Sequence, residues 1–273
     1  MKRKIIFAML LATIAAGCHQ HNDAITFYKD GDTTYYRCQV RTPMGEETID
    51  VEKGYSIAWP ENVPETLKHR LLELAFGDST GDIHKATDRY TEDLMLWDED
   101  TLIKAVAVDN KMDNTDSEGE SYSHVALDYT KDSSLYCFAI SKEYYIHHCA
   151  HGMYESHYVN YDADRRSIIH LNDLVDTALL APIILRAVED LTTNQSVNEC
   201  LMEEFRQSVP VTDNFYIDSS RSTINLVYQP YEIASYACGM QIVTLPIFWL
   251  SKHIELTPYC KKLFGPESYI DEP

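Results

Sequence analysis

Three closely spaced histidines are the strongest candidates in the sequence for a metal-binding or catalytic site. His147 and His151 are four positions apart, with His148 between them. In a helical zinc site of the H-E-x-x-H type, two histidines four apart share one face and the residue after the first is a glutamate, the general base. Here His148 takes the position of that glutamate, and the flanking residues indicate a strand followed by a turn. We therefore expect a structural or surface role for these histidines, and neither zinc catalysis nor a metal site.

An acidic segment offers a second candidate, for calcium. Asp109, Asp113 and Glu120 have the spacing of positions one, five and twelve of a calcium-binding loop. Lys111 stands at the third position, where an oxygen ligand is needed, and Asn114 stands where the loop requires glycine. The pattern favours a solvated acidic loop over residues 109–121.

Nucleophilic catalysis has little support in the sequence. There is no G-x-S-x-G motif, and Cys137 or Cys149 would form a dyad with a histidine only if the fold brought them together. Six cysteines other than Cys18 are present, and an even number in an exported protein is compatible with disulfides. We expect one or two disulfides with the other thiols buried, no identifiable catalytic residue and no cofactor. The six are Cys38, Cys137, Cys149, Cys200, Cys238 and Cys260.

The N-terminus predicts export. Basic residues at positions 2–4 precede twelve apolar residues at positions 5–16, a run too short to span a bilayer. Ala15, Ala16 and Gly17 then lead into Cys18, which resembles the bacterial lipobox, in which the cysteine is acylated and begins the mature chain. We expect a signal peptide over 1–17, lipid attachment at Cys18, a tether over 18–32, and anchoring to a bacterial membrane on its periplasmic face or at the cell surface. The alternative is an ordinary signal peptide with an incidental cysteine.

The charge balance limits the choice of partner. Lysine and arginine total 23 against 43 aspartates and glutamates, a net charge of −20, and loss of the signal peptide with its three basic residues makes it −23. A phosphate backbone would be repelled by such a protein, which argues against nucleic acid. A cationic partner would be attracted.

The apolar periodicity predicts an α+β fold. The predicted strands form hairpins, the predicted helices occupy separate segments, and regular βαβ units are lacking. We therefore expect an antiparallel sheet with helices packed on one side. Two consecutive subdomains are expected, over 33–121 and 122–273. The predicted strands are 33–40, 49–58, 122–129, 135–140, 144–148, 154–161, 215–218, 223–228 and 241–245, and the predicted helices are 64–76, one within 83–97, 179–191 and 196–209, the last opened by a Ser196-x-x-Glu199 capping box.

Several ordered segments of the second half resemble a known domain. They are HCAHGMY at 148–154, NYD at 160–162, IHLNDLV at 169–175 and INLVYQPYEIA at 224–234. They are similar to the extracytoplasmic domain shared by lysozyme-sensing anti-sigma factors and the accessory region of certain peptidoglycan deacetylases, which also occurs in free lipoproteins. The resemblance covers about residues 122–255, with His148 and Cys149 in place of glycines. No segment resembles the deacetylase catalytic domain or a sigma-binding region, so the resemblance implies the ectodomain alone.

This resemblance and the acidic composition lead to a functional expectation. We expect a lipid-anchored binding protein of the cell envelope that recognises a cationic protein such as lysozyme, or a cell-wall glycan such as peptidoglycan. The alternatives are a cell-envelope hydrolase and a structural component of a surface complex. Candidate contact residues are His151, Tyr154, Tyr228, Tyr231 and Tyr236, although such tyrosines also pack between helix and sheet.

Overall fold

The computed structural model describes residues 24–78, 80–94, 101–108 and 117–269. The expected signal peptide, Cys18, the start of the tether, and the calcium-loop residues Asp109 and Asp113 lie outside these ranges. Among the described helices, none combines the length and the apolar character that crossing a membrane requires.

Ten strands form the framework of the part that is described. They are β1 (Phe27–Thr42), β2 (Gly45–Pro60), β3 (Leu102–Val108), β4 (Gly119–Asp132), β5 (Leu135–Tyr145), β6 (Met153–Asp162), β7 (Ser167–Ile169), β8 (Phe215–Asp218), β9 (Thr223–Tyr228) and β10 (Gln241–Pro246). The α-helices are α1 (Glu65–Phe76), α2 (Ile83–Glu92), α3 (Leu180–Asp190), α4 (Gln195–Cys200), α5 (Ile247–Ser251) and α6 (Pro258–Phe264).

The strands form two sheets, and the fold is α+β as predicted. The larger sheet has seven strands in the order β3-β1-β2-β4-β5-β6-β7, and the smaller has three in the order β10-β9-β8. Every pairing within them is antiparallel except that of β2 with β4, which is parallel. The parallel pair departs from the expected antiparallel sheet. It is possible because α1, α2 and β3 form a long connection between the two strands.

The first hairpin and the first helix follow the sequence prediction closely. Gly77 ends α1 with φ of 66°, a left-handed conformation that glycine adopts at little cost. The first strand, however, begins at Phe27 and not at Thr33, so the expected tether is shorter. The ring of Phe27 stacks on that of Tyr129 with the centroids 3.6 Å apart. This contact stabilises the N-terminal end of β1 against the sheet.

The seven-stranded sheet continues across the expected boundary between subdomains. Residue 121 lies within β4, which pairs with β2 on one side and β5 on the other. Residues 33–121 and 122–273 therefore contribute strands to one sheet.

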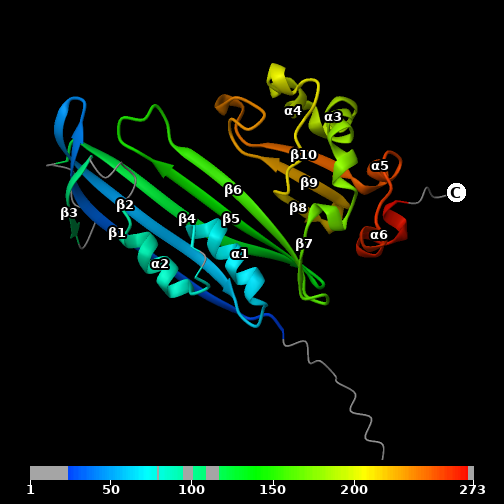
Figure 1. Ribbon diagram of the computed structural model, residues 1–273, viewed down its shortest axis with the longest axis horizontal. Coiled ribbons are helices and arrows are strands. Elements are labelled where there is room, and N and C mark those ends of the chain that lie inside the picture. The colour runs from blue at the N-terminus through cyan, green and yellow to red at the C-terminus, as the bar shows by residue number, and fades with distance from the viewer. Residues whose placement is uncertain (1–23, 79, 95–100, 109–116, 270–273) are drawn as a thin grey trace, which may run out of the picture.

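Helices α1 and α2 cover one face of the seven-stranded sheet (Figure 1). The apolar side of α1, with Leu67 and Leu71 fully buried, packs in one core cluster with Phe138 and Ile140 of β5. Residues of opposite parity on the same strands point away from these helices, because successive side chains of a strand alternate between faces. We call this second side of the sheet the open face.

The second core lies between the three-stranded sheet and helices α3, α5 and α6. Here α4 ends at Cys200 and not at Val209 as predicted. Cys200 is joined to Cys238 by the one disulfide among the described cysteines, and the Met202 N–H bonds to the carbonyl of Ile233. These contacts pull the chain out of helical conformation. The expected capping box is not formed either, since Asn194 occupies the N-cap position and Ser196 lies inside the helix.

Side-chain amides join β6 of the large sheet to the small sheet. Asn160 Nδ2 donates to the carbonyl of Phe215 at 2.8 Å, and its Oδ1 accepts from Ile217 N–H at 3.1 Å. In the other direction, Asn214 Oδ1 accepts from Tyr158 N–H at 2.9 Å and its Nδ2 donates to the carbonyl of Ser156 at 2.9 Å. Each amide takes the place of a peptide group in a neighbouring strand.

The opposite edge of the small sheet is satisfied in the same way. Asn194 is fully buried, and its side chain accepts from Thr244 N–H at 2.8 Å and donates to the Thr244 carbonyl at 3.0 Å. Thus β8 and β10, the two outer strands, each have an asparagine on their outer edge.

We predict that Asn160→Leu lowers the free energy of unfolding by about 2–5 kcal/mol, because it leaves the Phe215 carbonyl and the Ile217 N–H without partners inside the protein. Urea unfolding measures the change. The control is Asn172→Ala at an exposed position, with an expected change below about 0.5 kcal/mol. An equal effect of the two substitutions would contradict the role given to Asn160.

Candidate binding site

Four of the five predicted contact residues lie together. His151 and Tyr154 come from the end of the turn between β5 and β6 and the start of β6, whereas Tyr231 and Tyr236 come from the segment between β9 and β10. The imidazole of His151 lies on the ring of Tyr236 with the centroids 3.7 Å apart and an angle of 17° between planes. Tyr231 and Tyr154 flank Tyr236 at 5.6 and 6.0 Å. We call these four residues the aromatic cluster.

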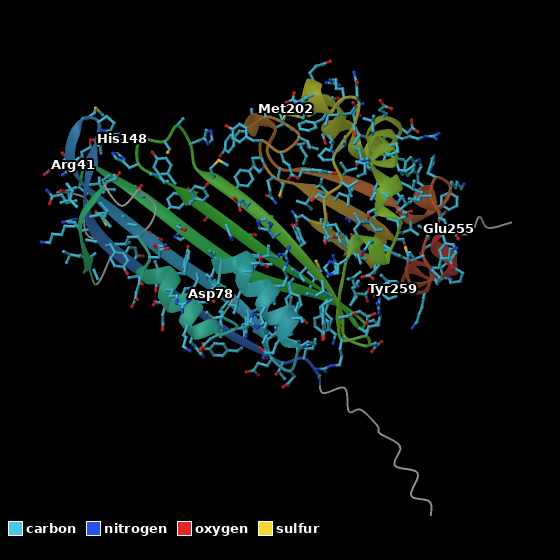
Figure 2. The ribbon with its side chains drawn as sticks, in the orientation of Figure 1. Arg41, Asp78, His148, Met202, Glu255 and Tyr259 are labelled. Atoms are coloured by element: carbon cyan, nitrogen blue, oxygen red, sulfur yellow. A yellow bond between two sulfur atoms is a disulfide. The ribbon has the colours of Figure 1, made fainter. Side chains whose placement is uncertain are left out.

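Hydrogen bonds fix the orientation of the rings. The Tyr236 hydroxyl donates to the Gly152 carbonyl at 2.6 Å, and His151 Nδ1 lies 2.9 Å from the same oxygen. Since a carbonyl only accepts, the proton of a neutral His151 ring is on Nδ1. Nε2 then accepts from the Tyr231 hydroxyl at 3.1 Å. Figure 2 marks the turn with His148, between the hairpin bearing Arg41 and the region of Met202.

Tyr231 combines exposure with an unfavourable backbone. Its φ is 71°, a left-handed value that costs a residue with a Cβ about 1–2 kcal/mol, and 54% of its surface is exposed. Backbone strain of this kind concentrates at functional sites. The exposed ring is therefore the part of the aromatic cluster most available to a partner.

The fifth predicted residue, Tyr228, is placed elsewhere. Its side chain is fully buried, its hydroxyl donates to the Pro210 carbonyl at 2.8 Å, and burial raises its pKa. Every residue of β9 is buried, since this is the central strand of the small sheet. The expectation that Tyr228 contacts a partner is corrected by this burial.

An acidic groove runs along the open face beside the aromatic cluster. It consists of two adjoining hollows of about 260 and 620 Å³ that share Glu52, His124 and Glu143. Asp50 and Glu120 extend the first hollow, and Tyr154 of the aromatic cluster lines the second. Of the residues described in these linings, Lys142 is the one lysine or arginine, and burial lowers its pKa. Arg37, outside the linings, pairs with Asp50 at 3.0 Å, and the carboxylates of the acidic groove outnumber its basic side chains.

His124 lies between two carboxylates at the centre of this groove. Its Nε2 is 2.9 Å from Glu52 and its Nδ1 is 3.3 Å from Glu143. Both nitrogens donate only when the ring carries a second proton. Tyr122 stacks beside His124 at 5.5 Å, so the groove also has an aromatic wall.

A third hollow on the open face continues the acidic character toward the small sheet. It measures about 630 Å³ and is lined by Asp128, Asp132 and Asp218 together with Lys131, and the rings of Tyr158 and Tyr216 in it are 5.0 Å apart. The acidic residues of the open face thus extend over both sheets.

The other candidate metal-binding and nucleophilic residues lie outside the aromatic cluster and the acidic groove. His147 and His148 contact Glu47 and are separate from the contacts of His151. Cys38, Cys137 and Cys260 are buried, and desolvation raises the pKa of each thiol to about 12, which opposes nucleophilic chemistry. Cys149 is exposed, contrary to the expectation that unpaired thiols are buried.

Sequence reasoning did not find the acidic groove. Glu52 and His124 lie in predicted strands, whereas Glu143 lies between the predicted strands 135–140 and 144–148, where the structure has the single strand β5. Their convergence depends on the parallel pairing of β2 with β4, which places Gly54 opposite His124. Alternating polar residues on neighbouring strands were the available signal.

Comparisons with known proteins give one family match, over part of the chain, and similarities to solved structures. Residues 172–247 match the model of a family described as "Protein of unknown function (DUF3298)". No curated protein sequence matches the chain. A crystal structure of a DUF3298 family member from Bacteroides fragilis is similar, with 16% identity, a TM-score of 0.56, and coverage of 88% of this chain and 97% of that one.

A second crystal structure, of a DUF3298 family protein from Pseudomonas aeruginosa, has 15% identity, the same coverages and a TM-score of 0.47. The DUF3298 match itself is confined to residues 172–247. The likeness to the Bacteroides fragilis protein extends over nearly all of the chain and concerns the fold.

We predict that Tyr231→Asn changes the free energy of unfolding by less than about 1 kcal/mol, because relief of the left-handed backbone offsets the lost ring contacts. Tyr236→Ala, which removes the stacked ring and its hydrogen bond to Gly152, should cost about 2 kcal/mol or more. Thermal or urea unfolding compares the two variants. A loss for Tyr231→Asn as large as that for Tyr236→Ala would show that Tyr231 supports the fold.

Proposed function

We propose that the protein is a lipid-anchored binding protein of the bacterial cell envelope that recognises a cationic protein, such as lysozyme, on its open face. The observation that carries the proposal is the acidic groove, where Asp50, Glu52, Glu120 and Glu143 line one hollow. A net charge of −20 adds long-range attraction for a positive partner. The resemblance to the ectodomain of lysozyme-sensing anti-sigma factors supports the same class of partner.

The aromatic cluster supplies the second element of a protein-binding surface. Tyrosine offers a large apolar ring with a polar tip, and such rings are enriched where proteins bind one another. Tyr154 lines the groove and contacts Tyr236, so acidic and aromatic side chains are continuous. We infer that the carboxylates raise the association rate and that the aromatic rings lower the dissociation rate of the complex.

We predict salt-sensitive binding of lysozyme by the chain from His19 onward. Raising the ionic strength from about 10 to about 150 mM shortens the Debye length from about 30 to about 8 Å and should weaken binding at least about tenfold. Glu52→Gln with Glu143→Gln should weaken binding at low salt and mainly slow association. Calorimetry gives the affinity, and binding measured on a surface that carries the immobilised protein gives the association and dissociation rates.

The matched control is Glu65→Gln with Glu73→Gln on α1, which makes the same change of net charge on the opposite side of the sheet. It should retain binding within about twofold. Equal loss in both double variants would mean that overall charge, and not the acidic groove, attracts lysozyme. Absence of lysozyme binding, or salt-independent binding of peptidoglycan fragments alone, would refute recognition of a cationic protein.

The proposed lipid anchor depends on Cys18. We predict that Cys18→Ala prevents incorporation of labelled palmitate and moves the protein from the membrane fraction to the soluble fraction, because the acylated thiol is the attachment point. Cys149→Ala is the control, since that cysteine is exposed but lies far along the chain. Membrane association that survives Cys18→Ala would contradict the anchor.

A further inference from the structure

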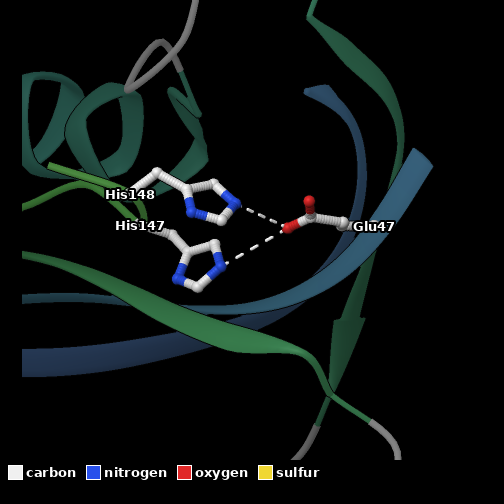
Figure 3. A group of neighbouring side chains, drawn as sticks. All are labelled: Glu47, His147 and His148. Carbon is white, nitrogen blue, oxygen red and sulfur yellow. Dashed lines mark hydrogen bonds and ion pairs between the residues drawn. The ribbon is translucent and has the colours of Figure 1, made fainter. Parts of the chain in front are cut away.

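Two adjacent histidines meet a glutamate from a distant part of the sequence at one end of the large sheet. Glu47 is on β2, and His147 and His148 are in the turn between β5 and β6 (Figure 3). His148 Nε2 lies 2.8 Å and His147 Nε2 3.4 Å from the same oxygen, Oε2 of Glu47. One potential ligand atom from each residue lies within 4.8 Å of the others. The three side chains thus point at a common centre.

The backbone at His148 produces this convergence. Neighbouring side chains of an extended chain point in opposite directions, and two adjacent histidines would normally diverge. His148 has φ of 71°, a left-handed conformation, and the rings of His147 and His148 are 3.9 Å apart. A residue with a Cβ pays for this conformation, and such strain is typical of functional positions.

A glycine on β4 makes room for the His147 ring. A Cβ at Gly119 would lie 2.1 Å from His147 Cε1, so no other residue fits there without displacing the imidazole. The His147 N–H donates to Ser121 Oγ at 2.9 Å and holds the start of the turn against β4. The ring is therefore positioned by its surroundings.

The carboxylate of Glu47 is oriented by a hydrogen bond from Thr42. Thr42 Oγ1 donates to its Oε1 at 2.7 Å, which leaves Oε2 directed at the histidines. The Thr42 hydroxyl, and next the His148 imidazole, hold the pKa of Glu47 below its ordinary value. The side chains of Glu47 and His147 are 12% and 18% exposed, whereas His148 is 39% exposed and leaves access from solvent.

We propose that Glu47, His147 and His148 bind a divalent transition-metal ion of the zinc class. Two imidazole nitrogens and one carboxylate oxygen are ligands that Zn²⁺ accepts, and Thr42 is the outer partner that aligns the carboxylate. Tetrahedral bonds of about 2.0–2.2 Å place ligand atoms about 3.3–3.6 Å apart, so small adjustments of the present contacts suffice. Three protein ligands leave a fourth position for water or another ligand.

The bound ion would connect two parts of the molecule. Glu47 lies next to the tip of the first hairpin, and the turn that carries His147 and His148 continues to His151 of the aromatic cluster. A metal would hold this turn to the hairpin and stabilise the folded state, because it binds the assembled ligands and not the unfolded chain.

The test is calorimetric titration of ZnCl₂ into the untagged protein after dialysis against a chelator. We expect one ion per chain and a rise in the thermal unfolding midpoint. Glu47→Gln and His148→Asn should each weaken binding at least about tenfold. Glutamine can keep the bond to Thr42, and asparagine tolerates the left-handed backbone, so both variants should retain the metal-free unfolding midpoint. CoCl₂ gives a second readout, because its visible absorption reports the coordination geometry.

The control is His170→Asn, which removes an exposed histidine that pairs with Asp213 at 3.1 Å outside this cluster. It should bind Zn²⁺ like the unaltered protein. Absence of stoichiometric Zn²⁺ binding would overturn the proposal. So would binding that Glu47→Gln and His148→Asn leave unchanged, or binding that His170→Asn weakens to the same degree.

Discussion

Peptide groups on the outer edges of β8 and β10, the two outer strands of the small sheet, are hydrogen-bonded by two asparagine side chains. Asn160 bonds to the outer edge of β8, and Asn194 bonds to the outer edge of β10. An open strand edge inside a protein leaves donors and acceptors without partners, and each costs about 1–3 kcal/mol. On the β8 edge, Asn160 attaches the small sheet to β6 of the larger sheet, and on the β10 edge Asn194 attaches it to Ala187 of α3.

The attachment of the small sheet determines where the functional side chains lie. Asn214 and Gln229 bond to Ser156 of β6 and bring the segment after β9 to the start of that strand. Tyr231 and Tyr236 are on this segment and therefore reach His151. The aromatic cluster is thus assembled by the amides between the sheets, and the acidic groove ends at it because Tyr154 belongs to both.

The sequence predicts local structure well and the assembly of the sites poorly. Periodicity and glycine chemistry locate the first hairpin and α1, because those signals are contained within a few residues. The end of α4 was missed because it depends on the disulfide to Cys238 and on contacts of Met202 with Ile233. Four of the five candidate contact residues lie together in the structure, whereas Tyr228 is buried, because periodicity alone does not identify which strand lies at the centre of the small sheet.

The segment that matches the DUF3298 model does not contain every residue on which the small sheet depends. Residues 172–247 contain the small sheet, Asn194 and Asn214, but Asn160 lies outside them. Leu135 and Ile169, which share the core of that sheet, also lie outside. A fragment limited to residues 172–247 would carry a sheet with one bare edge and a truncated core. The matched segment therefore needs the preceding strand β6 to complete its hydrogen bonding.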